Sequence, residues 1–209
     1  MMAKTHITVG IAASLAICMP TTPDEVLSAV MGGAIGGILC DIECRSTPQM
    51  RDALYGRFIV AAITSLILLS DKIFNTGIIA SILSQDRFSL ILGSAILLVT
   101  CIFGRLSDHR TFTHSLLFVL LISFGFYCVT PKLLYPVLAG GLSHLVIDTL
   151  NRMPVPWLYP LKKKGICFKL CYASKTGNAI CMWIGFVTSL ALLAWRISIM
   201  TGAIQYFKP

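Results

Sequence analysis

Apolar runs that lack charged residues constrain this 209-residue chain more than any other feature. Only 12% of the residues are charged and the mean hydropathy is +0.81, which leaves too few charges to cover a water-soluble fold. We therefore predict one domain over residues 1–209, an all-α, polytopic membrane helix bundle of about seven spans. The seven runs are Ile7–Met19, Val26–Cys40, Phe58–Ser70, Phe88–Gly104, Ser115–Val129, Leu133–Ile147 and Ala179–Met200.

Most of these runs are shorter than the ~20 residues that cross a hydrocarbon core, so their helices are expected to continue into polar flanks. The extended helices would cover Pro23–Cys44, Tyr55–Asp71 and Lys132–Asn151. An eighth run, Ile73–Ser84, contains Asn75 and Gly77 and is short. We predict that it is a re-entrant or interfacial segment rather than a span.

Basic residues predict the orientation of the chain in the membrane. With seven spans and a cytoplasmic N-terminus, residues 1–6, 41–57, 104–114 and 148–178 lie in the cytoplasm and hold 12 of the 17 Lys and Arg residues. The first apolar run lacks a small-residue cleavage site, so it is expected to be a retained span rather than a signal peptide. A reducing cytoplasm and the lack of a Cys-x-x-Cys pair predict free thiols at all eight cysteines.

Glycines in the second run are spaced for close helix packing. Gly32 with Gly36 and Gly33 with Gly37 form two overlapping Gly-x-x-x-Gly pairs. Such pairs let the backbone of a neighbouring helix approach closely. We expect a helix to pack against this face, near the end of the run that leads to Asp41.

The ionisable residues gather on the predicted cytoplasmic face. All four histidines lie at its span ends together with several carboxylates, and histidine nitrogen and carboxylate oxygen are the ligands of catalytic zinc sites. These residues supply enough ligands for one metal ion or two. The potential ligands are His6, Asp41, His109, His114, His144 and Asp148, and Glu43 and Asp108 lie beside them.

His144 and Asp148 form the most informative local pattern. Residues four apart share one face of a helix, where they can hold one metal ion together, or the carboxylate can orient the imidazole. An ordinary hydrogen bond that closes the helix end is the alternative. Ionisable groups within a span cost several kcal/mol to bury and are usually functional, which favours the metal.

The segment from His109 to Ser115 holds two histidines five residues apart, which a regular helix would point in different directions. At least one of them is expected in the loop before the helix, with Thr111 or Thr113 as the N-cap. Arg110 is either a membrane anchor or a clamp for a phosphate or another anion. The chain has no phosphate-binding loop, serine-hydrolase elbow or zincin motif, which argues against a nucleotide-driven pump and a serine hydrolase.

Four motifs together resemble the YdjM-like family, which are LexA-regulated, inner-membrane, metal-dependent hydrolases. The resemblance covers residues 3 to about 160, and the family is in turn distantly similar to all-helical zinc-dependent phospholipase C and single-strand-specific zinc nucleases. The motifs are Thr5-His6, Cys40-Asp41-Ile42-Glu43, the segment His109 to Leu116, and Leu142-Ser143-His144 followed by Asp148-Thr149.

The resemblance implies a set of metal ligands: His6, Asp41, His114, His144 and Asp148. His109 would be a further ligand or an acid on the substrate side. One or two zinc ions are expected, with manganese as the alternative metal. Glu43 departs from the family pattern, which usually has aspartate there. The later His and Glu ligands of the soluble enzymes have no clear counterpart, so a three-zinc cluster is not expected.

We therefore expect a membrane-embedded, zinc-dependent hydrolase of the phospholipase C kind at the cytoplasmic face of the inner membrane. A metal-activated water would attack a phosphoester, with Glu43 or Asp108 as general base and Arg110 neutralising charge on the substrate. The expected partner is a membrane lipid or a lipid-linked small molecule, and not nucleic acid. Two alternatives remain: a metal-ion or proton transporter, and a non-catalytic membrane protein with a structural metal.

Overall fold

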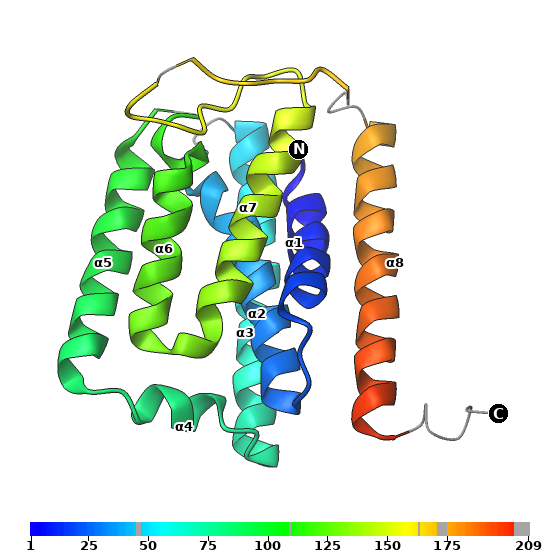
Figure 1. The fold of residues 1–209 in the computed structure, drawn as a ribbon. Coiled ribbons are helices and arrows are strands. Elements are labelled where there is room, and N and C mark those ends of the chain that lie inside the picture. Colours follow the sequence, from blue (N-terminus) through cyan, green and yellow to red (C-terminus); the bar gives the residue numbers. More distant parts are fainter. Residues whose placement is uncertain (45–46, 109, 163, 171–174, 203–209) are drawn as a thin grey trace.

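The computed structural model describes residues 1–44, 47–108, 110–162, 164–170 and 175–202. These residues form eight α-helices and three short 3-10 turns (Figure 1), and their only β-type pairing is a bridge between Val155 and Ile166. The α-helices are α1 (Ala3–Cys18), α2 (Pro23–Leu39), α3 (Thr47–Phe74), α4 (Ile78–Leu83), α5 (Arg87–Leu106), α6 (Leu116–Val129), α7 (Leu134–Leu150) and α8 (Lys175–Met200). The turns are η1 (Cys40–Glu43), η2 (Phe112–His114) and η3 (Pro131–Leu133).

Each of the seven apolar runs corresponds to one α-helix, which confirms the all-α prediction. Among the described residues, five helical segments are long and apolar enough to cross a membrane, and α1 and α6 are shorter apolar helices. The 16 residues of α1 and the 14 of α6 extend over about 24 Å and 21 Å, against ~30 Å of hydrocarbon. The eighth run forms the six-residue helix α4, which lies crosswise between the ends of α3 and α5 in Figure 1.

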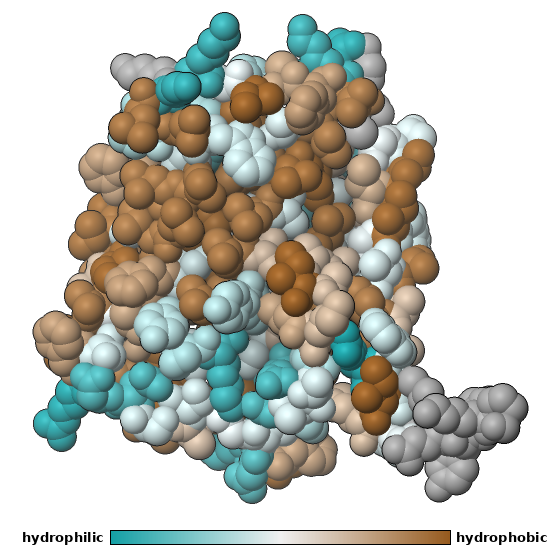
Figure 2. All heavy atoms as spheres, viewed as in Figure 1, coloured by the Kyte–Doolittle hydropathy of each residue, from teal (hydrophilic) through white to brown (hydrophobic). Residues whose placement is uncertain are grey.

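The outer surface is that of a membrane protein. Figure 2 shows a broad apolar band between two more polar ends of the molecule. Large apolar side chains that are more than half exposed lie on the peripheral helices, such as Leu66 on α3, Val99 on α5 and Val187 on α8. An apolar surface of this extent matches lipid rather than water.

Glycines bring α1, α2 and α7 into close contact. A Cβ atom added at Gly33 would lie 2.6 Å from the Gly10 carbonyl oxygen, and one added at Gly36 would lie 2.3 Å from the Val137 carbonyl oxygen. The overlapping glycine pairs of α2 thus allow the approach that their spacing predicts, on two sides at once. Around this centre, α6 packs on α7 and α5 on α6, and α8 packs on α1 from the other side (Figure 1).

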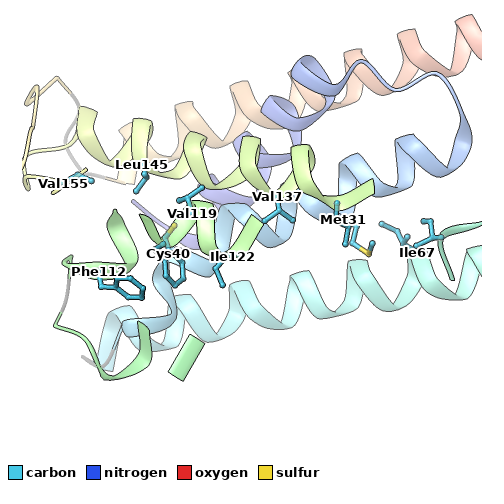
Figure 3. Packing of buried hydrophobic residues seen from close by; sticks show 12 residues of the cluster. Met31, Cys40, Ile67, Phe112, Val119, Ile122, Val137, Leu145 and Val155 are labelled. Carbon is cyan, nitrogen blue, oxygen red and sulfur yellow. The ribbon is translucent and has the colours of Figure 1, made fainter. Parts of the chain in front are cut away.

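The helix ends that carry the predicted ligands meet at the upper end of the bundle in Figure 1. Figure 3 shows that Cys40, Val119 and Leu145, from three different elements, form part of the apolar core that leads to this end. Residues 151–162 and 164–170 pass over it, and the backbone N–H of Phe168 donates to the Thr149 carbonyl at 2.8 Å. The seven cysteines among the described residues are free thiols, as predicted.

Candidate metal centre

Four separate elements bring five of the predicted ligands together. α1 carries His6, η1 carries Asp41, η2 carries His114, and α7 carries His144 and Asp148. Their side chains are almost fully buried, and that of Asp41, at 13% exposure, is the most open. Their nitrogen and oxygen atoms form two three-residue groups in which all ligand atoms lie within 4.8 Å of one another.

His6, His144 and Asp148 form the first group. His6 Nε2 lies 3.5 Å from Asp148 Oδ1, and His144 Nε2 lies 3.9 Å from Asp148 Oδ2. The two imidazole rings stack with their centroids 3.7 Å apart. The helical spacing of His144 and Asp148 therefore places both on one face of α7, and α1 supplies the third ligand from across the helix contact.

Asp41, His114 and His144 form the second group. Asp41 Oδ1 lies 3.9 Å from His114 Nε2 and 3.8 Å from His144 Nε2, and these two nitrogens are 3.4 Å apart. His144 Nδ1 lies 2.8 Å from the Gly37 carbonyl oxygen, so this nitrogen is the donor and Nε2 keeps its lone pair. His144 belongs to both groups, and the lone pair on its Nε2 can bind only one ion. The two groups therefore fit either one metal ion, or two metal ions of which only one contacts His144.

Glu43 is buried beside the second group but belongs to neither. Its carboxylate accepts a hydrogen bond from the Thr113 hydroxyl, one from the Arg110 backbone N–H at 2.5 Å, and one from His114 Nδ1 at 3.1 Å. Ser115, rather than either threonine, caps α6, which leaves the Thr113 hydroxyl available to Glu43. This position favours a role for Glu43 in orienting His114, whose Nε2 then points into the group.

The surroundings of His114 favour the cationic form of its imidazole, in which both ring nitrogens carry a proton. Burial by itself would lower the pKa, but hydrogen bonds to Asp148 and Glu43 outweigh burial and raise the pKa of His114 to about 9. His114 Nε2 lies 3.4 Å from Asp148 Oδ2. A metal ion that binds this nitrogen must therefore displace a proton.

His6 is the clearest indication that the cluster is built for a ligand. It is fully buried, and among the described residues neither of its ring nitrogens has a hydrogen-bond partner, although Nε2 lies 3.5 Å from the Asp148 carboxylate. A buried polar atom without a partner costs free energy, about 1–3 kcal/mol in proteins. His6 Nε2 lies 3.5 Å from Asp148 Oδ1, which also accepts a hydrogen bond from the Met1 ammonium at 2.8 Å. A metal cation at this oxygen would take the place of the ammonium and give His6 a partner, and the histidine and carboxylate donor set suits zinc.

The predicted catalytic residues near His114 have different surroundings. The Arg110 guanidinium donates to Asp148 Oδ2 at 2.7 Å and to the Met153 carbonyl at 3.1 Å, so it covers the cluster from the outside. Asp108 is exposed, and among the described residues no hydrogen bond or ion pair joins its carboxylate to the cluster. His109 lies outside the described residues.

Two arginines hold the η1 turn in place. Arg57 donates to the Asp41 carbonyl at 3.0 Å, and Arg105 donates to the carbonyls of Ile42 and Cys44 at 3.0 and 3.1 Å. Carbonyls at a helix end lack partners within the helix, and these side chains supply them. The sequence pattern predicts both arginines only as orientation signals, whereas the structure shows that they also fix the turn that carries Asp41.

Comparison with known protein families finds one that matches almost the whole chain. The model described as YdjM inner membrane protein matches residues 1–207. No curated protein and no solved structure matches this chain.

Proposed function

Because this chain belongs to the YdjM inner membrane protein family and is a multi-pass inner-membrane protein, we propose that its buried cluster serves hydrolysis in the membrane. The proposed protein is a metal-dependent hydrolase of the phospholipase C kind that cleaves a phosphoester. The observation that carries this proposal is the convergence of three histidines and two aspartates from four elements, where neither nitrogen of the buried His6 is hydrogen-bonded within the part of the chain that the structure describes.

Zinc is the proposed metal, as one ion or two, with manganese as the alternative. His6, Asp41, His114, His144 and Asp148 would hold it, since zinc sites combine imidazole nitrogen with carboxylate oxygen. When bound, such an ion acts as a Lewis acid toward a phosphoryl oxygen and lowers the pKa of water in its coordination shell to about 7. Glu43 and the Gly37 carbonyl would orient the imidazoles of His114 and His144 so that each Nε2 atom is available to the metal.

Arg110 is the residue that we propose to meet the substrate. Its guanidinium lies at the outer edge of the cluster, on Asp148, and a planar guanidinium suits two oxygens of a phosphate group. Because the ligands are nearly closed off from the surface, Arg110 must leave Asp148 when substrate enters. An anionic phosphate would draw it in that direction.

The proposed orientation places the cluster on the cytoplasmic side. It assumes seven spans with α1 and α6 included, so that basic segments such as residues 148–178 face the cytoplasm. A phosphoester substrate at this face would be a membrane lipid or a lipid-linked small molecule.

A structural metal site is the second candidate, because four elements meet at the cluster and its ligands are nearly closed off from solvent. A metal-ion or proton transporter is less favoured. The cluster lies at one end of the bundle, and a transport pathway would need ionisable groups across the depth of the membrane.

The test compares metal content and phosphoester hydrolysis in four purified proteins. They are the wild type, His144→Ala, Asp148→Asn, and Asp24→Asn, which removes a carboxylate at the other end of α2. We expect about one or two equivalents of zinc or manganese in the wild type and in Asp24→Asn, and loss of metal and of hydrolysis in the other two. Metal without hydrolysis of any phosphoester would favour the structural site. A folded wild type that binds no metal after supplementation would overturn the proposal.

A further inference from the structure

An apolar groove of about 390 Å³ lies between the start of α6 and the segment after Pro156. This volume is within the range of ~300–1,000 Å³ that is usual for ligand clefts. Its walls are formed almost entirely by apolar side chains, among them Leu116, Leu117, Leu120, Trp157, Tyr159 and Leu161.

One wall of the groove faces the lipid. Leu117 and Leu120 belong to α6, a helix of the apolar band, and they are 40% and 48% exposed. Trp157 and Tyr159, from the segment after Pro156, also line the groove. Aromatic residues of this kind are enriched where the hydrocarbon meets the headgroups. The groove is therefore open to hydrocarbon on one side and reaches the headgroup level on the other.

Hydrogen bonds and short chain segments connect the residues that line the groove with two of the proposed metal ligands. Leu116 lies two residues after His114, and its backbone N–H donates to the Trp157 carbonyl at 2.9 Å. The indole N–H of Trp157 donates at 2.7 Å to the hydroxyl of Thr149, the residue that follows Asp148. The walls of the groove are therefore connected to the chain within two residues of two proposed ligands, His114 and Asp148.

Basic residues lie on the segment that supplies the aromatic lining of the groove. Lys162 and Lys164 follow its last wall residue and are exposed, and Arg152 is exposed on the same segment. Juxtamembrane lysines attract anionic headgroups, by about 1 kcal/mol each. An apolar groove with cationic side chains on the same segment complements an amphiphile that has an acyl chain and a negative headgroup.

We propose that this groove binds one acyl chain of an anionic phospholipid and brings its phosphate toward Arg110 and the metal cluster. That this lipid is also the substrate rests on the hydrolase function proposed above. Binding itself does not depend on catalysis, so the two can be tested separately.

The experiment uses the full chain in detergent and a phosphatidylglycerol that carries a photoreactive diazirine in its acyl chain. After illumination, mass spectrometry locates the adducts. We expect them on the peptides that contain Leu116–Leu120 and 157–161. In Leu120→Trp, whose indole fills the groove, labelling of these peptides falls about tenfold, the effect of losing contact with about two methylenes. Leu190→Trp on α8, where the leucine is 51% exposed, is the matched control and leaves this labelling unchanged.

The headgroup is tested with phosphatidylcholine that carries the same diazirine chain. It should label the groove about tenfold more weakly, and the double variant Lys162→Gln/Lys164→Gln should remove this difference. Labelling spread evenly over the exposed faces of α3, α5 and α8, or unchanged in Leu120→Trp, would overturn the groove as a lipid site. Groove labelling without phosphoester hydrolysis supports the lipid site and contradicts the hydrolase. Phosphoester hydrolysis without labelling of the groove supports the hydrolase and contradicts the lipid site.

Discussion

At the scale of single residues, two of the three histidines in the cluster are oriented by a contact at the ring nitrogen that faces away from the other ligands. His144 uses Nδ1 on the Gly37 carbonyl and His114 uses Nδ1 on Glu43, so both present Nε2 to the same point. Among the described residues, no such hydrogen bond is made by His6, whose ring stacks on that of His144 and whose Nε2 lies 3.5 Å from Asp148 Oδ1. Hydrogen bonds to the distal nitrogen fix the tautomer and orientation of metal-binding histidines, so Glu43 should influence metal binding without touching the metal.

Glu43→Ala should weaken zinc binding by about 10- to 100-fold, the usual effect of removing a carboxylate that orients a ligand histidine. Glu43→Gln keeps an acceptor oxygen near His114, so its zinc affinity should fall less than that of Glu43→Ala. Competition with a chelating dye measures both affinities. The control is Glu25→Gln, whose carboxylate caps the N-terminal end of α2, the end that points away from the cluster. An unchanged affinity in Glu43→Ala would refute the orienting role.

Zinc affinity should rise with pH because the metal and a proton compete for His114. The pKa of His114 is raised to about 9, so below that pH its imidazole carries a proton that zinc must displace. The apparent affinity is therefore expected to increase about tenfold per pH unit from about pH 6.5 to 8.5. Calorimetry in buffers of different ionisation enthalpy counts the released protons. Zinc binding without proton release at pH 7 would contradict the competition between zinc and a proton for His114. The groups that face His114 are Asp41, Glu43, His144 and Asp148.

At the scale of the elements, apolar runs and glycine spacing predict the helices well, because both are local properties of the sequence. The ends of the helices are less predictable. α2 stops at Leu39 and continues as the η1 turn, although its pattern predicts a helix to Cys44. The turn is held by Arg57 and Arg105 from two other helices, and such contacts leave no local pattern in the sequence. The hydrogen bond from Thr113 to Glu43 was missed for the same reason.

Gly37→Ala should loosen the metal cluster through the contact between α1 and α2. A Cβ atom at Gly37 would lie 2.5 Å from the His6 carbonyl oxygen, so α1 must move away and take the His6 imidazole with it. Overpacking of this kind costs about 1–3 kcal/mol and should lower both the melting temperature and the zinc affinity.

Gly93→Ala is the matched control for this prediction. Its Cβ atom would lie 2.7 Å from the Gly125 carbonyl oxygen, in the contact between α5 and α6 and away from the four elements that carry the ligands. It should lower the melting temperature in a similar way and leave the zinc affinity unchanged. If both variants bind zinc as the wild type does, the position of α1 does not control the cluster.

At the scale of the whole molecule, the two ends of the bundle differ in kind. The upper end in Figure 1 holds buried histidines and carboxylates from four elements. At the other end, polar residues complete local structure: Asp71 accepts the backbone N–H groups that begin α4, and Lys132 pairs with Asp24. The sequence predicts which residues share the first end. It does not predict how closed that end is, because the cover comes from residues 151–162 and 164–170, whose contacts with the bundle join residues far apart in the sequence.

The charge difference between the two ends predicts the sidedness of the whole molecule. Leu161 is 89% exposed on the basic segment, and Ser84 is exposed between α4 and α5 at the opposite end. If basic segments stay in the cytoplasm, a membrane-impermeant maleimide should label Ser84→Cys in intact spheroplasts. Leu161→Cys should be labelled only after lysis. Both variants are compared with a parent whose accessible native cysteines have been replaced. The opposite pattern would place the cluster outside the cytoplasm, where the substrate proposed above would have to reach it from the other leaflet.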